Sequence, residues 1–307
     1  MMDIKFNITY ITLDGYIQVH KYRFLYFVIM FTVYILILCC NFIVVSLIVT
    51  QKSLHEPMYV FIAALLLNSV LFSTVVYPKL LIDILSERQI ISYSSCFLQH
   101  FLYYSLGSSE FLLLTAMAYD RYVSICKPLQ YPTIMERRTI SILLVFAWIT
   151  PAFHLFVSLL AVRMLNENPC SYSLNGIFCN SPLYHLLCVR LEALVILDMM
   201  TLVNVALLPL LCILFSYIRI LIISYRSSTE VKKKASRTCI PHLLVLISFS
   251  CFGAYDVITV VVESDISKIV HLAVTLQMVV FQPLFNPIIY GLKMKEIYKH
   301  LKRLAGL

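Results

Sequence analysis

The chain has few charged residues for its length. Of its 307 residues only 13% are Asp, Glu, Lys or Arg, while 61% are hydrophobic. A typical soluble domain carries about a quarter charged residues. This chain therefore lacks the polar surface that a water-soluble fold of its size needs, and its composition predicts an integral membrane protein.

Glycine is also scarce, with six residues in the whole chain. The apolar runs do not alternate apolar and polar residues, which is the pattern that a membrane β-barrel requires. Several runs exceed the roughly 20 residues that an α-helix needs to cross a bilayer. We therefore expect an all-α membrane protein, built as a bundle of spanning helices.

Signatures of enzymes and of secretion are missing as well. The sequence has no glycine-rich phosphate loop, no His/Cys cluster with zinc spacing and no nucleophile elbow. We expect neither catalysis nor a metal or cofactor. The polar N-terminus has no basic–apolar–small-residue pattern, so we expect no cleaved signal peptide, and the first spanning helix would direct insertion.

Hydropathy predicts seven spanning helices. Their approximate ranges are 24–49, 58–85, 96–125, 139–161, 193–222, 239–262 and 269–291. We expect an N-terminal tail over 1–23, a seven-helix bundle over 24–291 and a short C-terminal helix or tail over 292–307. No internal repeat is visible, so the bundle is one domain.

Lysine and arginine indicate the orientation, because they concentrate in cytoplasmic loops. With the N-terminus outside and the C-terminus in the cytoplasm, the inner face holds most of the 24 basic residues. The net charge of +8 then reflects topology and contact with anionic membrane lipid, and does not indicate nucleic acid. A glycosylation sequon and four cysteines would lie on the oxidising outer side: Asn7-Ile8-Thr9, Cys96, Cys170, Cys179 and Cys188.

The most informative stretch is MAYDRYVSICKPLQY, residues 117–131. Asp120 and Arg121 stand side by side where the third apolar run ends. An exposed ion pair in a soluble protein contributes under about 1 kcal/mol. Charges at the edge of a membrane helix are costly and mark functional sites by default, so we expect this pair to be functional.

Motifs in every span add to this stretch. One set comprises Asn41, Leu65, Asp120-Arg121-Tyr122, Trp148, Pro209, Tyr217 and Asn286-Pro287-Ile288-Ile289-Tyr290. A second set comprises LHEPMY (54–59), the 117–131 string, Ser216-Tyr217, KASRTC (234–239) with His242, and three cysteines in the loop between spans four and five. On the first set the chain resembles the rhodopsin-like G-protein-coupled receptors, and on the second it resembles the odorant receptors among them.

The resemblance implies an activation switch at the inner face. Arg121 would pair with Asp120 at rest and turn toward a G protein when span six swings outward. The residues expected to take part are Asp120, Arg121, Tyr122, Tyr217, Arg237, His242, Asn286, Pro287 and Tyr290. Arg237 and His242 would replace the acid that other receptors carry at the inner end of span six; for His242 a purely structural role is the alternative.

The resemblance also implies a ligand pocket between the outer halves of the spans. The candidate lining residues are Tyr103, Tyr104, Gly107, Ser108, Phe111, Asp198, Thr201, Val205, Tyr255, Asp256, Thr259, Leu276 and Val280. Asp198 and Asp256 would either pair internally or meet a cationic ligand group. Packing alone is the alternative for any member of this set.

Further expectations concern disulfides and a buried acid. The resemblance implies a Cys96–Cys179 bridge and leaves Cys170 and Cys188 for a second one. Most rhodopsin-like receptors carry an aspartate in span two that helps to hold sodium, whereas Asn68 and Ser69 stand in that neighbourhood here. Glu110 in span three is therefore a candidate ion or proton site with a single carboxylate.

The function implied is that of an odorant receptor in the plasma membrane of olfactory sensory neuron cilia. It would bind a small-molecule odorant and activate a stimulatory, olfactory-type heterotrimeric G protein, with a trafficking chaperone as a further partner. One alternative is a non-olfactory chemosensory receptor of the same fold. Another is a small transporter or channel, which would need polar lining along several spans.

Overall fold

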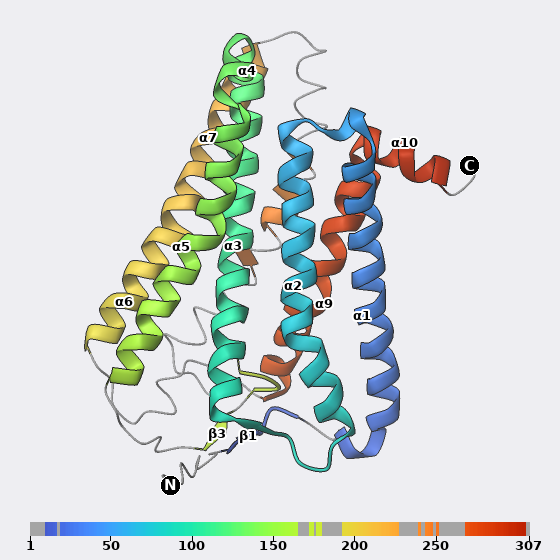
Figure 1. Cartoon of the computed structure of the whole chain (residues 1–307), viewed down its shortest axis with the longest axis vertical. Coiled ribbons are helices and arrows are strands. Elements are labelled where there is room, and N and C mark those ends of the chain that lie inside the picture. Colours follow the sequence, from blue (N-terminus) through green and yellow to red (C-terminus); the bar gives the residue numbers. More distant parts are fainter. Residues whose placement is uncertain are drawn as a thin grey trace, which may run out of the picture.

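The computed structural model describes residues 10–16, 19–164, 172–174, 176–179, 192–226, 239–240, 243–247, 250–251 and 268–304. Long helices run side by side along the longest axis of the molecule (Figure 1). The main ones are α1 (Val19–Thr50), α2 (Pro57–Leu85), α3 (Tyr93–Cys126), α5 (Arg137–Met164), α7 (Leu208–Arg226) and α9 (Lys268–Lys293).

Three shorter α-helices are also described. They are α4 (Tyr131–Ile134), α6 (Glu192–Leu202) and α10 (Lys295–Leu304). The fifth expected span is built from three pieces, because a π-helical stretch, Val203–Leu207, joins α6 to α7. Such π-bulges occur frequently at functional sites. Of the sixth expected span, 239–262, the residues that are described (239–240, 243–247 and 250–251) are helical.

Local sequence explains where individual helices begin. Pro57 occupies the first turn of α2, where its missing N–H group costs nothing. Ser92 precedes α3, and its hydroxyl accepts a hydrogen bond from the Ser95 amide at 3.3 Å. Within the apolar runs, helices form because every backbone polar group in a bilayer must be bonded internally.

Length and composition allow five of the described helical segments to cross a membrane. They are Lys21–Thr50, Pro57–Leu85, Arg137–Val162, Met199–Tyr225 and Leu272–Leu292. Their outward surfaces are strongly apolar: Phe24, Phe146 and Phe153 are all more than half exposed. A surface of this kind faces lipid in a membrane protein, and packing between the helices holds the bundle together.

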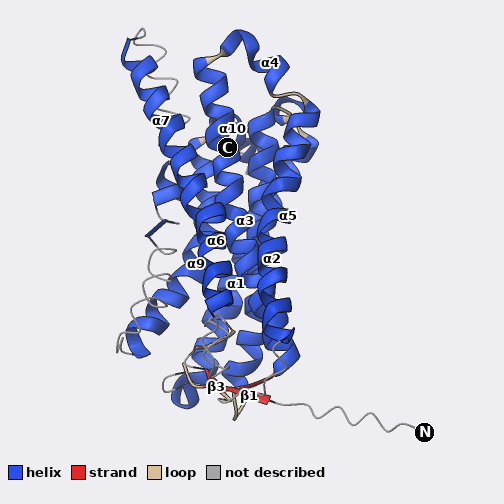
Figure 2. Ribbon diagram, turned by 90° about the vertical axis from the view of Figure 1, so that its left-hand side faces the viewer, coloured by secondary structure: helices blue, strands red, loops and turns tan. Residues whose placement is uncertain are grey.

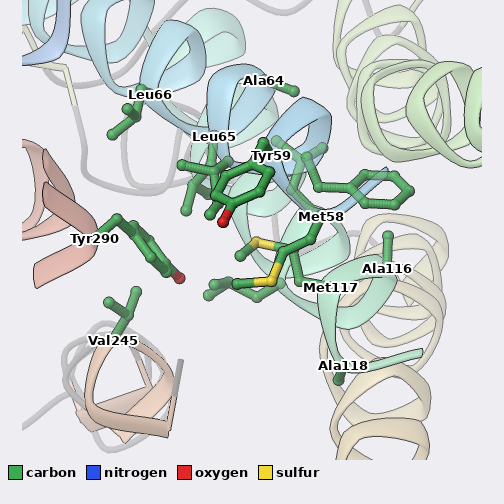
Figure 3. Close-up of a cluster of buried hydrophobic side chains, with 14 of the residues drawn as sticks. Met58, Tyr59, Ala64, Leu65, Leu66, Ala116, Met117, Ala118, Val245 and Tyr290 are labelled. Carbon is green, nitrogen blue, oxygen red and sulfur yellow. The ribbon is translucent and has the colours of Figure 1, made fainter. Parts of the chain in front are cut away.

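The core is divided between two ends of the bundle, which we name after residues found there. The Arg121-end core includes Tyr217 and four residues labelled in Figure 3: Tyr59, Leu65, Met117 and Tyr290. The disulfide-end core includes Phe72, Tyr77, Tyr103, Phe178 and Met278. Both cores contain residues of α2, α3 and α9. Because α2 and α3 contribute to both ends, they form the centre of the bundle.

A small sheet lies at the disulfide end (Figure 2). It consists of β1 (Tyr10–Leu13), β2 (Ile90–Ser92) and β3 (Ser173–Leu174) in the order β2-β1-β3. Strand β1 is antiparallel to β2 and parallel to β3. The segment before the first helix therefore joins the connection between α2 and α3 to the connection between α5 and α6.

Two adjacent leucines of α2 test this burial pattern. Leu66 is 0% exposed, whereas Leu67 is 39% exposed. We expect Leu66→Ala to lower the free energy of unfolding by about 2–5 kcal/mol, because the truncation leaves a cavity in the core. Leu67→Ala should have a much smaller effect. Thermal unfolding of the detergent-purified protein measures both, and equal losses of stability would contradict the burial of Leu66.

Candidate functional site

The expected charged pair lies at the end of α3 and is buried. The Asp120 carboxylate is 0% exposed, and the Arg121 side chain is 11% exposed. The Arg121 Nε donates to Asp120 Oδ2 at 2.9 Å, and a second guanidinium nitrogen contacts the same oxygen. The structure therefore brings Asp120 and Arg121 together as an ion pair in a site largely closed to solvent.

The other oxygen of Asp120 is held by Tyr131. The Tyr131 hydroxyl donates to Asp120 Oδ1 at 2.8 Å. Burial, and then the negative charge of Asp120, raise the pKa of Tyr131 well above its ordinary value, so the hydroxyl stays protonated and remains a donor. In the sequence Tyr131 is only the last residue of the 117–131 string, and nothing there predicts this role.

Tyrosines from α7 and α9 surround the same end. Tyr217 is 6% exposed and Tyr290 is 0% exposed. The Tyr290 hydroxyl has no hydrogen-bond partner among the described residues and lies near Leu65, Tyr59 and Val245 in Figure 3. Tyr122 faces α7 instead, with its ring centroid 6.1 Å from that of Phe215. Arg237 and His242 lie outside the described residues.

A polar node connects α2, α3 and α9 in the middle of the bundle. Asn286 Nδ2 donates to Glu110 Oε1 at 2.8 Å and to Ser69 Oγ at 3.0 Å. All three residues are at most 3% exposed. Inside α9, Pro287 directly follows Asn286, and Pro283 precedes Asn286 by about one turn. The node thus holds the proline-containing part of α9 against the two central helices.

Asn68, next to Ser69 on α2, bonds to residues outside the Glu110 node. Its Nδ2 donates to the Leu106 carbonyl at 2.9 Å, and its Oδ1 accepts from Trp148 Nε1 at 3.2 Å. Asn68 therefore ties α2 to α3 and α5. Of the two polar residues in that neighbourhood of span two, Ser69 is the one that contacts Asn286, and through it the Glu110 node.

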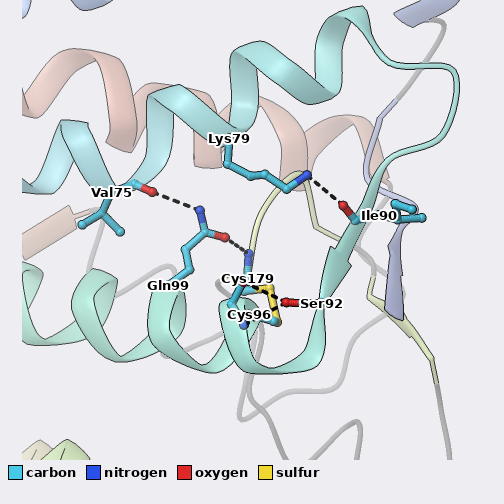
Figure 4. The surroundings of a disulfide bond; sticks show 8 residues. Val75, Lys79, Ile90, Ser92, Cys96, Gln99 and Cys179 are labelled. Carbon is cyan, nitrogen blue, oxygen red and sulfur yellow. Dashed lines mark hydrogen bonds between the residues drawn. A yellow bond between two sulfur atoms is a disulfide. The ribbon is translucent and has the colours of Figure 1, made fainter. Parts of the chain in front are cut away.

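At the disulfide end, the expected Cys96–Cys179 disulfide is present, with the two Cα atoms 5.4 Å apart. Gln99 stabilises the bridged loop (Figure 4). Its Oε1 accepts from the Cys179 amide at 3.1 Å, and its Nε2 donates to the Val75 carbonyl at 3.1 Å. The loop is thereby fixed to α2 as well as to α3. Cys170, Cys188 and Asn7 lie outside the described residues.

Several candidate pocket residues gather at this end. Tyr103 is almost fully buried, its ring lies 5.1 Å from the rings of Tyr104 and Phe178, and its hydroxyl donates to Met278 Sδ at 3.1 Å. Leu276 and Val280 pack against the same core. Phe178 and Met278 were missed by sequence reasoning, although Phe178 directly precedes a bridged cysteine.

Of the remaining candidates, Gly107 adjoins the disulfide-end core, because a Cβ atom there would lie 3.9 Å from the Phe72 ring. Phe111 belongs to the Arg121-end core. Thr201 donates within its own helix to the Leu197 carbonyl at 2.8 Å, and Val205 is buried in the π-helical stretch. Gly107 and Ser108 are partly buried on α3. Tyr255, Asp256 and Thr259 lie outside the described residues, as does the side chain of Asp198.

Among the described residues, no group of three or more His, Cys, Asp or Glu side chains could hold a metal ion. The polar groups of the described residues have other arrangements. The bundle has a buried ion pair at one end, a disulfide-bridged loop over an aromatic cluster at the other, and a polar node between them.

Comparison of the fold gives the class. The structure of squid rhodopsin superposes with a TM-score of 0.70 at 18% sequence identity, covering 94% of this chain and 86% of that one. The chain thus has the seven-transmembrane-helix fold of the rhodopsin-like receptors, as the sequence predicted.

Comparison of the sequence gives the family. A family model described as olfactory receptor matches residues 30–306. Human olfactory receptor 2T27 is 33% identical over 288 residues, covering 93% of this chain and 90% of that protein. Human olfactory receptor 4N5 is 35% identical over 311 residues, covering 98% and 97%. The chain belongs to the olfactory receptor family. It is a multi-pass membrane receptor and not an enzyme.

The Glu110 node generates a test with sodium. Of Ser69 and Glu110, only Glu110 carries a carboxylate, and we expect a single carboxylate not to hold sodium. The wild-type protein should therefore have the same melting temperature in sodium chloride and in choline chloride of equal concentration. Ser69→Asp adds the second carboxylate. An ion present at about ten times its Kd raises the free energy of unfolding by about 1.4 kcal/mol. This corresponds to a melting temperature higher by roughly 2–4 °C, so the Ser69→Asp variant should melt higher in sodium chloride than in choline chloride.

Ser69→Ala is the matched control, since it removes the hydroxyl without adding a charge, and it should show no sodium effect. A clear stabilisation of the wild-type protein by sodium would contradict the single-carboxylate interpretation. Differential scanning fluorimetry of the purified receptor makes all three comparisons.

Proposed function

We propose that this protein is an odorant receptor whose disulfide end faces outside and whose Arg121 end faces the cytoplasm. It binds a small odorant in the outer half of the bundle and activates a stimulatory, olfactory-type G protein. The family supports receptor function in general, and the plasma membrane of olfactory neuron cilia is the proposed location. A trafficking chaperone is the further partner proposed for its delivery there.

The observation that carries this proposal is the placement of two features on one helix. Cys96 and Arg121 are both on α3, and 25 helical residues span about 37 Å. The hydrocarbon core of a bilayer is about 30 Å thick. A disulfide at one end and a buried arginine at the other therefore belong to opposite sides of the membrane. The basic inner loops support the same orientation.

The proposed ligand chamber adjoins the aromatic cluster around Tyr103. Phe72, Tyr103 and Phe178 form a continuous set of ring contacts, with centroids 5.0 and 5.1 Å apart. Ligand sites between helices are mostly apolar, with a few polar groups that fix orientation. Such a surface suits a small, largely apolar molecule. Asp198 and Asp256 remain candidates for a cationic group on the ligand.

The proposed output is release of Arg121. The contacts of Asp120 support this proposal, because Arg121 donates to one oxygen of its carboxylate and Tyr131 to the other. An agonist that favours a second packing of the helices would shift the population toward the state in which Arg121 is free. Pro283, Pro287 and the π-helical stretch Val203–Leu207 are places where α9 and the fifth span can bend.

Glu110 is proposed as a proton acceptor in this switch. Two donors from the Asn286 amide already point at Glu110 and Ser69. A cation there would have to displace these N–H groups and would find one carboxylate only. A proton on Glu110 changes the strength of its bond to Asn286 without such displacement. The sodium comparison described above separates the two possibilities.

The experiment expresses the receptor with an olfactory-type stimulatory α subunit and a trafficking chaperone, and measures cyclic AMP. The panel contains volatile amines, carboxylic acids, alcohols and aldehydes, together with non-volatile amino acids and steroids. We expect Arg121→Ala to abolish the agonist response while surface expression is kept, because the cation that meets the G protein is gone. Arg137→Ala, an exposed arginine at the same end, is the control and should respond normally.

An unchanged response in Arg121→Ala at equal surface expression would contradict the coupling role. A wild-type receptor that reaches the surface and responds only to non-volatile compounds would favour a chemosensor outside olfaction.

A further inference from the structure

The segment before the first helix, residues 10–16, is built into the loops of the disulfide end. Strand β1 lies between β2 and β3, as the central strand of the sheet. Beyond the strand pairing, the amides of Thr12, Leu13 and Asp14 donate to the carbonyls of Tyr172, Gln89 and Leu174 at 2.8–2.9 Å. This segment therefore contributes the backbone that joins the two neighbouring loops to each other.

One face of the strand is fully buried. Ile11 and Leu13 are at most 2% exposed and pack with Ile91, Leu174 and the Cys96–Cys179 disulfide. Tyr10, on the other face, is 52% exposed. The alternation matches a strand with one face against a core. The disulfide thus lies beneath the N-terminal segment and is covered by it.

The end of the segment makes a close backbone contact with the disulfide-bridged loop. The Gly15 amide donates to the Gly176 carbonyl at 3.2 Å. A Cβ atom on Gly15 would lie 2.5 Å from the Gly176 carbonyl carbon, closer than real side chains approach. Only glycine fits at this position without a shift of the loop backbone.

Tyr16 makes the next contact. Its hydroxyl donates to the Ile177 carbonyl at 2.9 Å. Burial, and then the nearby Asp83 carboxylate at the end of α2, raise the pKa of Tyr16 far above its ordinary value. The hydroxyl therefore stays a donor throughout the physiological range. Asp83 is itself paired with Lys79, whose ammonium also donates to the Ile90 carbonyl at 2.9 Å (Figure 4).

Contacts continue from Tyr16 into the proposed ligand chamber. Ile177 and Phe178 are at most 3% exposed and belong to the disulfide-end core. The ring of Phe178 lies against that of Tyr103, and Tyr103 donates to Met278 on α9. Each step is a direct contact, so displacement of Tyr16 would remove one of the contacts that hold Ile177 and Phe178 in place, beside the disulfide and Gln99.

We infer that residues 10–16 form part of the roof of the ligand chamber, with Tyr16 as the positioning residue that holds Ile177 and Phe178 over Tyr103. The inference rests on the proposed ligand site in this half of the bundle. It extends that proposal, because the barrier between the chamber and the outside is then set by the N-terminal segment as well as by the bridged loop.

A reporter thiol below the roof tests this directly. Ser108 lies on α3 below Tyr103 and Tyr104, and Ser108→Cys changes a single atom. Intact cells expressing this variant are exposed to a small, membrane-impermeant cationic methanethiosulfonate for increasing times. The receptor is then denatured, and a fluorescent maleimide labels the thiols that the methanethiosulfonate has not modified, so the fluorescence measures how many remain. The parent receptor without the new cysteine gives the background from native cysteines.

Two roof variants are combined with the reporter. Tyr16→Phe removes only the hydroxyl, and Gly15→Ala forces the backbones of residues 15 and 176 apart. We expect each to speed labelling of the reporter thiol by about tenfold, because losing one buried hydrogen bond shifts an opening equilibrium by roughly that factor. Tyr10→Phe removes a hydroxyl from the exposed face of the same strand and should leave the rate unchanged.

The labelling rate is compared at equal surface expression, measured by cell-surface biotinylation. If Gly15→Ala is retained inside the cell, Tyr16→Phe decides. Equal rates for Tyr16→Phe and Tyr10→Phe would overturn the inference. Fast labelling of the Ser108→Cys receptor that carries no roof substitution would overturn the inference too, because the roof would then be open. The assay needs neither an odorant nor a G protein, so its failure is distinct from failure of the proposed function.

Discussion

The Asp120 carboxylate is completely buried at the end of α3, and the Arg121 end of the bundle depends on keeping both of its oxygens bonded. An unpaired charge in such a place costs several kcal/mol. Arg121 satisfies one oxygen and Tyr131 the other. The short helix α4 is therefore tied to the long helix α3 by the same carboxylate that holds the arginine. Release of Arg121 has to be coupled to a rearrangement around Asp120, which makes the pair suitable as a switch.

Isolated polar contacts connect the helices in a similar way elsewhere. Asn41 donates to the Pro283 carbonyl at 2.9 Å, joining α1 to α9. Asn68 joins α2, α3 and α5, and Asn286 joins α9 to α2 and α3. Lipid supplies no hydrophobic force between helices, so packing and such bonds fix the arrangement. The node at Asn286 lies between the two ends and next to the prolines of α9. It is well placed to pass a change from the proposed ligand chamber to Arg121.

Much of this arrangement follows from sequence patterns. Hydropathy located the long helices to within a few residues, because the bilayer imposes a minimum apolar length and internal backbone bonding. The motif at Asp120 and Arg121 identified the family, and the Cys96–Cys179 disulfide followed from it. The scarcity of glycine and of charge was sufficient to exclude other fold classes. These signals are local, or are fixed by the membrane itself.

Most of the contacts that escaped sequence reasoning are between segments distant in the chain. Strands of two to four residues carry no clear periodicity, so nothing marked residues 10–13 as the centre of a sheet. Asn68 and Ser69 are adjacent, and only the rotation of α2 decides which one contacts Asn286. Phe111 has the aromatic side chain expected in a pocket, yet its position along α3 places it in the Arg121-end core. Tyr131 gained its role from the fold of the loop after α3.

The central claim is that Asp120 holds Arg121 in the resting state. Basal cyclic AMP production of Asp120→Asn, normalised to surface expression, tests it most directly. The substitution keeps the shape and an acceptor for Tyr131 but removes the charge that retains the guanidinium. A loss of about 1.4 kcal/mol of retention corresponds to a tenfold shift toward the free state. The account predicts basal signalling raised severalfold; basal signalling equal to or below wild type at the same surface level would contradict it.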